Sequence, residues 1–98
     1  MPSYYSMKDY KFVKFQKSNT KGKKYDAIIE NKKTGQTTTL PFGSSEYEQY
    51  KDSTGLGLYS DKDHNDKMRR TLYRKRHEVF LKPDMYSPGY FSYKYLWK

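Results

Sequence analysis

The sequence predicts an α+β domain, in which a three-stranded antiparallel meander precedes a basic helix and a short aromatic C-terminal helix. Three strand-like runs separated by turn residues occupy the first half of the chain, and a basic stretch with helical spacing follows them. The chain has 98 residues, which suits one small domain. We therefore expect residues 1–9 to form an irregular N-terminal arm and residues 10–98 to form a single domain.

The three predicted strands are separated by turn residues. Residues 10–15 interleave lysine with aromatic and β-branched residues, and residues 24–30 form the second run. Residues 31–35 predict a hairpin loop in which Gly35 supplies a positive φ. The third run, residues 36–42, contains Pro41, which has no N–H to give to a sheet. This strand should therefore end at Pro41 or lie at an edge.

Residues 43–60 are predicted to form a connector, with one helical turn at residues 45–50 and two partly buried leucines within residues 54–58. The basic helix should begin near Asp61–Asp63, where an acidic side chain can cap it, and should run to about Val79. Its apolar residues share one stripe at helical spacing, which consists of Met68, Leu72 and Val79.

The end of the basic helix and the start of the last helix are both marked by proline. Lys82 and Pro83 are expected to end the basic helix, because the residue before a proline avoids helical geometry. Residues 87–97 predict the short C-terminal helix, with Ser87 as N-cap and Pro88 at the first helical position.

Aromatic residues must supply most of the core. The chain has 12 Tyr, 5 Phe and 1 Trp but few aliphatic residues, and each aromatic side chain can bury roughly 150–250 Å². Tyrosine is also frequent at interfaces, because it brings a large contact area at low entropic cost. We expect the aromatic residues of the two helices to serve core packing or an interface: Tyr73, Tyr90, Phe91, Tyr93, Tyr95 and Trp97.

The net charge of +9 indicates an anionic partner or a neighbour with an acidic surface. The strongest candidate for that contact is the basic helix, through Lys67, Arg69, Arg70, Arg74, Lys75 and Arg76. Alternatively, these side chains form a solvated face paired with Asp61, Asp63, Asp66 and Glu78. The alternation of lysine and aromatic residues in 10–15 is typical either of a stacking platform for a single nucleic-acid strand or of a strand with one face on the core.

The absence of cysteine favours an intracellular protein, or a virion assembled inside a cell, over a small secreted domain. No apolar run approaches the roughly 20 residues that a membrane span requires, and residues 1–10 lack the apolar centre of a signal peptide. We therefore predict no membrane span.

The sequence contains no complete catalytic or metal-binding motif. Residues 61–72 superficially resemble a calcium loop, but Asp66 and Leu72 stand where that loop needs glycine and glutamate. A metal-dependent nuclease that uses Asp61, Asp63 or Asp66 with His64 is a remaining alternative. We predict a protein that is not an enzyme and that needs neither metal nor cofactor.

One resemblance bears on function, and it extends from residue 42 to Trp97, with the N-terminal strands in outline. A Phe-Gly and Tyr segment (residues 42–50) leads to the pattern His64-x-Asp66-x-x-Arg69, in a helix that ends in Arg76-His77. A Gly-aromatic-Ser helix that ends in Leu-Trp follows (residues 87–97). This order resembles a group of small basic proteins encoded by large DNA viruses of algae and amoebae.

The resemblance implies a viral origin and a structural or interaction protein, and a minor capsid protein is the leading expectation. Capsid proteins would then be the partners, and the protein would be found in the virion and, during assembly, in the host cell cytoplasm. A sequence-nonspecific protein that binds DNA or RNA is the alternative.

Overall fold

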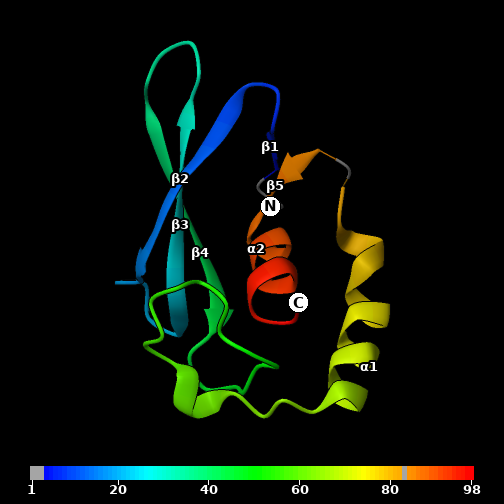
Figure 1. Ribbon diagram of the computed structural model, residues 1–98. Helices are drawn as coiled ribbons and strands as arrows, with labels where there is room; N and C mark the ends of the chain where they lie inside the picture. The colour runs from blue at the N-terminus through cyan, green and yellow to red at the C-terminus, as the bar shows by residue number, and fades with distance from the viewer. Residues whose placement is uncertain (1–3, 83) are drawn as a thin grey trace.

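The computed structural model describes residues 4–82 and 84–98, and it has an α+β fold (Figure 1). Its central element is an antiparallel sheet in the order β2-β3-β4, formed by Tyr10–Lys17, Lys23–Asn31 and Thr37–Ser44. Helix α1 (Lys67–His77) and helix α2 (Pro88–Tyr95) follow, and α2 lies between the sheet and α1 (Figure 1). The predicted fold class, a three-stranded meander followed by a basic helix and a short C-terminal helix, is confirmed.

The sheet follows the local signals of the sequence closely. Gly35 has a φ of 74°, and its N–H donates to the carbonyl of Asn31 at 2.8 Å, which closes the β3–β4 turn. Pro41 lies within β4, which is an edge strand, and an edge tolerates proline because its nitrogen need not face a neighbouring strand. The pairing of β2 with β3 shifts between Phe12 and Lys14, and β2 continues to Lys17.

The N-terminal segment is more ordered than its composition predicts. Tyr5–Ser6 form β1, which pairs antiparallel with β5 (Met85–Tyr86). The N–H of Met7 also donates to the carbonyl of Asp84 at 2.8 Å. The prediction of an irregular arm over residues 1–9 is therefore wrong for this segment, while residues 1–3 lie outside the described part of the chain. The partner strand is distant in the sequence, so no local pattern indicated the pairing.

The core lies between the inner face of the sheet and α2. Phe91 of α2 is its centre, and its ring lies 5.7 Å from those of Phe12 and Phe42 and 5.6 Å from that of Tyr86. The buried cluster consists of Tyr25, Ala27, Ile29, Leu40, Phe42, Phe91 and Leu96. Aromatic rings thus supply much of the buried area, as the composition predicted.

Helix α2 begins as predicted. The Ser87 Oγ accepts a hydrogen bond from the N–H of Tyr90 at 3.1 Å, and Pro88 is the first helical residue. The helix ends at Tyr95, two residues earlier than the sequence suggested.

Helix α1 begins later than the predicted position at Asp61–Asp63. Ser60–Lys62 form a short 3-10 helix, η1, and Asn65 then adopts a φ of 54°, which separates the two helices. Asp66 is the N-cap, and its carboxylate accepts from the N–H groups of Met68 and Arg69 at 2.9 and 3.1 Å. The helix ends at His77, and a second 3-10 helix, η2 (Glu78–Phe80), follows it. Pro83, the predicted stop, lies outside the described residues.

The connector between β4 and α1 has no regular helix at residues 45–50, and Leu56 and Leu58 are exposed rather than buried. It leaves the sheet at Gly43, which has a φ of 76°. A β-carbon at this position would lie 2.8 Å from the Cδ1 atom of Leu96. Glycine therefore allows the chain both to turn here and to pass close to the C-terminal segment.

Candidate interaction surface

Helix α1 contacts the rest of the protein through a cationic and aromatic side. The Arg74 Nη1 atom donates to the carbonyl of Trp97 at 3.0 Å, and its guanidinium carbon lies 4.3 Å from the centre of the Tyr93 ring. The guanidinium of Arg70 lies 4.7 Å from the centre of the Tyr50 ring. Because a guanidinium is weakly hydrated and stacks on aromatic faces, arginine can pack here as an apolar residue would.

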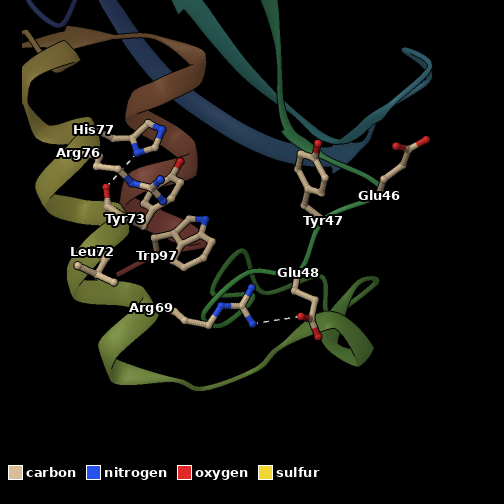
Figure 2. Close-up of a pocket in the computed structure, with 9 residues that line it drawn as sticks. All are labelled: Glu46, Tyr47, Glu48, Arg69, Leu72, Tyr73, Arg76, His77 and Trp97. Atoms are coloured by element: carbon tan, nitrogen blue, oxygen red, sulfur yellow. Dashed lines mark hydrogen bonds and ion pairs between the residues drawn. The ribbon is translucent and has the colours of Figure 1, made fainter.

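A column of rings reinforces this contact (Figure 2). The Tyr73 ring stacks with those of His77 and Trp97, at centre distances of 4.0 and 4.1 Å and interplanar angles of 16° and 7°. Trp97 also lies 5.2 Å from the ring of His64, which precedes α1. The Tyr73 hydroxyl bonds to the Oγ of Ser92 at 3.1 Å. The column therefore joins α1 to α2 and to the segment after α2.

The apolar side of α1 faces solvent. Met68 and Leu72 of α1 and Val79 of η2 are 70, 52 and 75% exposed, and no residue of α1 is buried. The usual position of such a stripe is against the core, so the helix is docked by its polar side instead. At about 100° per residue, the stripe is bordered by cations on both sides, namely Arg69 and Arg76 on one and Lys75 on the other.

An open groove of about 570 Å³ separates α1 from the start of the connector (Figure 2). Leu72 and Arg76 line the α1 side, while Glu46 and Tyr47 line the connector side, and Tyr47 is 71% exposed. Arg69 crosses one part of the groove to pair with Glu48 at 3.2 Å. The groove therefore has apolar and aromatic surfaces between walls of opposite charge.

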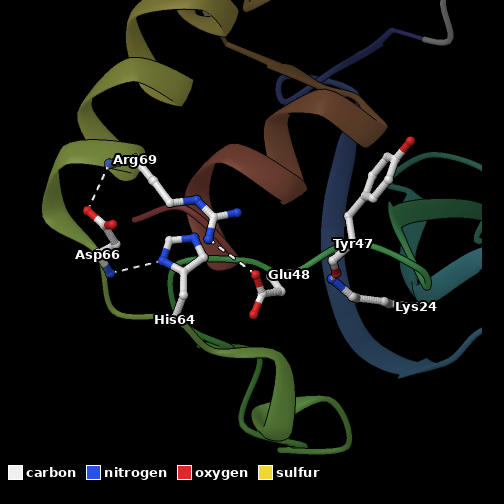
Figure 3. A network of polar contacts seen from close by, with 6 residues as sticks. All are labelled: Lys24, Tyr47, Glu48, His64, Asp66 and Arg69. Atoms are coloured by element: carbon white, nitrogen blue, oxygen red, sulfur yellow. Dashed lines mark hydrogen bonds and ion pairs between the residues drawn. The ribbon is translucent and has the colours of Figure 1, made fainter.

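Hydrogen bonds of the buried Lys24 side chain hold the connector in place; Figure 3 shows Lys24 and Tyr47. Lys24 is only 1% exposed. Its ammonium donates to the carbonyl of Tyr47 at 2.6 Å and to the Oε1 of Gln49. The Gln49 amide in turn donates to Asp63 at 2.6 Å. Burial lowers the pKa of Lys24 to about 8, and the charge of Lys62 adds to this effect.

A second buried contact anchors the far end of the connector. The Tyr25 hydroxyl donates to the carboxylate of Asp52 and accepts from the N–H of Leu58 at 3.0 Å. Burial, followed by the hydrogen bond to Asp52, raises the pKa of Tyr25 to about 12. Asp52 also accepts from the hydroxyl of Thr54 at 2.6 Å. The connector thus owes its shape to polar groups rather than to the two leucines that the sequence singled out.

His64 is a structural residue in this arrangement (Figure 3). Its Nδ1 accepts from the N–H of Asp66 at 2.9 Å, so the neutral ring carries its proton on Nε2. Burial lowers the pKa of His64, and the nearby charge of Arg69 acts in the same direction. Within residues 4–82 and 84–98, no three His, Asp or Glu side chains come together to hold a metal ion.

The six predicted basic contact residues do not share one face. Arg70 and Arg74 face the C-terminal segment, Arg69 and Arg76 line the groove, and Lys67 and Lys75 are exposed. In the described part of the chain, none of these residues forms an ion pair with Asp61, Asp63, Asp66 or Glu78. Arg69 pairs with Glu48 instead.

The six predicted aromatic residues all lie against the C-terminal segment or the core. Phe91 and Tyr93 are buried, and the other four, Tyr73, Tyr90, Tyr95 and Trp97, are half-buried. Sequence reasoning missed the groove wall formed by residues 46–48, because its position depends on the buried bond between Lys24 and the carbonyl of Tyr47. No pattern in the sequence marks Lys24 as buried among so many exposed lysines.

No protein-family model matches this chain, and neither the curated proteins nor the solved structures give a significant match. Within the described residues, none of the helices is both long and apolar enough to cross a membrane. The chemistry of the surface is therefore the basis on which function is inferred.

Proposed function

We propose that this protein is a non-enzymatic interaction protein that packs against a larger protein through α1, and that it serves as a minor capsid protein of a large DNA virus. The observation that carries the proposal is the exposed apolar stripe of Met68, Leu72 and Val79. A helix that turns its apolar side to solvent exposes surface that is stabilised by burial in a partner. Insertion of such a helix into a groove is a common mode of recognition.

The charges around the stripe define the partner. Lys75 borders it on one side, and Arg69 and Arg76 border it on the other. A matching groove is therefore apolar at its centre and acidic at its rims, since complementary rim charges steer association and exclude wrong partners. Tyr47, across the groove from Leu72, adds an exposed aromatic ring of the kind that anchors interfaces.

Exposed apolar side chains on other elements support several contacts rather than one. Val13 on β2 and Leu56 and Leu58 in the connector are 46, 42 and 52% exposed. A small protein that fills the space between larger subunits needs contact surfaces of this kind on more than one side. The viral setting itself rests on the resemblance of residues 42–97 to small viral proteins.

The virion assignment has a direct test. Quantitative mass spectrometry of purified virions should find the protein at a fixed ratio to the major capsid protein. Nuclease treatment of opened virions should leave it bound, because the contacts that hold it are to protein. Release on digestion of the DNA would contradict the proposal and favour a packaging role.

Replacement of Met68 and Leu72 by glutamine should weaken partner binding by at least about tenfold, since truncated interface anchors commonly have effects of this size. Glutamine is nearly as good a helix former as the residues it replaces, and exposed substitutions usually change stability by about 0.5 kcal/mol or less. The double variant should therefore melt normally while its incorporation into virions falls. The matched control replaces Thr37 and Thr39 by glutamine, because both are exposed on β4 and neither belongs to an apolar contact surface. Normal incorporation of the α1 variant, or an equal loss in the control, would exclude α1 as the docking element.

A further inference from the structure

A second pocket of about 570 Å³ lies beside α1, between the helix and the C-terminal segment, and it shares no lining residue with the groove. Its walls are strongly basic. The lining residues are Arg70, Thr71, Arg74, Lys75, Glu78, Tyr93 and Lys98. Four of these seven side chains are cations and one is acidic, so the pocket concentrates positive charge in a concave site.

The two guanidinium groups of the pocket are held in place by the fold. Arg70 and Arg74 are one helical turn apart, so their side chains leave the same side of α1. Arg74 is fixed by its bond to the carbonyl of Trp97 and by the Tyr93 ring. Arg70 is fixed by the Tyr50 ring and by a bond of 3.4 Å to the main-chain oxygen of Lys98. Side chains that are already ordered lose little entropy when they bind a ligand.

These cations have donors to spare and no Asp or Glu side chain as a partner among the described residues. A guanidinium has five N–H donors, and each of these two uses one in a hydrogen bond to the main chain. Among the described residues, no Asp or Glu side chain lies within ion-pair distance of Arg70, Arg74, Lys75 or Lys98. Glu78 lines the pocket without pairing to them. The remaining N–H groups are therefore available to an anion.

We propose that this pocket binds a phosphate group, either the terminal phosphate of a nucleotide or a phosphate of a nucleic-acid backbone. Paired arginine forks match the geometry of phosphate oxygens, and Lys75 and Lys98 add unpaired charge that suits a dianion. The site faces away from the groove side of α1, and Lys75 belongs both to its wall and to the border of the apolar stripe.

The test uses the whole chain and titrates it separately with inorganic phosphate, with AMP and with a five-nucleotide oligothymidylate that lacks a terminal phosphate. Amide chemical shifts measured by NMR should move saturably at Arg70, Arg74 and Tyr93. Stronger binding of AMP assigns the pocket to terminal phosphates, and stronger binding of the oligonucleotide assigns it to backbone phosphates. Absence of saturable binding of all three probes would overturn the proposal.

Three variants distinguish a specific phosphate site from nonspecific electrostatic attraction of anions to a basic protein. Lys75→Gln should weaken phosphate binding several-fold, and because Lys75 is exposed, the fold should persist. Glu78→Gln should strengthen binding, since Glu78 is the acidic side chain of the pocket wall. Lys33→Gln removes the same charge from the exposed β3–β4 turn, away from α1, and should leave binding unchanged. Equal losses in the Lys75 and Lys33 variants, or binding of acetate as strong as that of phosphate, would show that no phosphate site exists.

Discussion

Replacement of Phe91 by alanine is expected to lower the free energy of unfolding by about 3–5 kcal/mol, the usual cost of removing a large buried aromatic ring. Phe91 is 1% exposed, and its ring contacts those of Phe12, Phe15 and Phe42 from the sheet. Because it also contacts Tyr86 of β5, its loss leaves a cavity at the point where both sheets meet α2. Neighbours fixed in two sheets cannot collapse into this space without breaking strand pairing.

This cost is large for a domain of this size. Small proteins have total stabilities of about 5–15 kcal/mol, and each kcal/mol corresponds to about 4–8 °C of melting temperature in domains of up to 100 residues. We therefore expect Phe91→Ala to melt at least about 12 °C below the parent protein. Removal of residues 87–98, which also deletes Leu96 and Trp97, should prevent stable folding.

Thermal unfolding followed by circular dichroism measures both effects. Tyr47→Ala is the matched control, because it removes an aromatic ring that is largely exposed and should hardly change the melting temperature. If the Phe91 variant or the truncated chain melts with the parent protein, α2 is not the element that holds the core together.

The parts of the fold that were predictable are those with local causes. The β3–β4 turn depends on the positive φ of Gly35, and the start of α2 depends on Ser87 and Pro88. Each of these residues acts within a few positions of itself, so its effect is visible in the sequence. Burial alternates along part of β4, which is a local pattern, whereas the central strand β3 is buried at every position from Lys24 to Ile29.

The errors arise where several nearby residues offer the same local signal, or where contacts between residues far apart in the sequence determine the structure. The sequence predicted that α1 begins near Asp61–Asp63, but Asp66 is the N-cap. Asn65 adopts a positive φ directly before it, which separates α1 from the preceding turn. The stripe of Met68 and Leu72 has the spacing of a core face, yet contacts of Tyr73 with Trp97 turn the other side of the helix inward. Stacking between rings far apart in the sequence has no periodic signature. Sequence reasoning thus found the basic residues of α1 but not which direction each one faces.

The buried Lys24 predicts an unusual dependence of stability on pH. Its pKa is near 8 in the folded protein and 10.5 when unperturbed. Between these values the folded state binds fewer protons than the unfolded state, so stability should rise as the pH increases from about 8 towards 10. Tyr25 acts in the opposite direction at higher pH, because its pKa is raised from 10 to about 12 and the folded state then keeps a proton that the unfolded state loses. The gain should therefore reverse above about pH 10.

Comparison of Lys24→Met with Lys23→Met isolates the effect of the buried ammonium. Lys23 is the exposed neighbour of Lys24 on β3, so both variants lose one lysine from the same strand while the other lysines and tyrosines titrate equally in both. In the parent protein and in Lys23→Met, chemical denaturation should show the unfolding free energy rising by about 1–3 kcal/mol across this window, since one pKa unit corresponds to 1.36 kcal/mol. In Lys24→Met the rise should disappear, even if loss of the bonds to Tyr47 and Gln49 lowers stability at every pH. Equal slopes in the two variants would mean that Lys24 titrates as a solvated lysine, and that its charge does not oppose the folding of the connector.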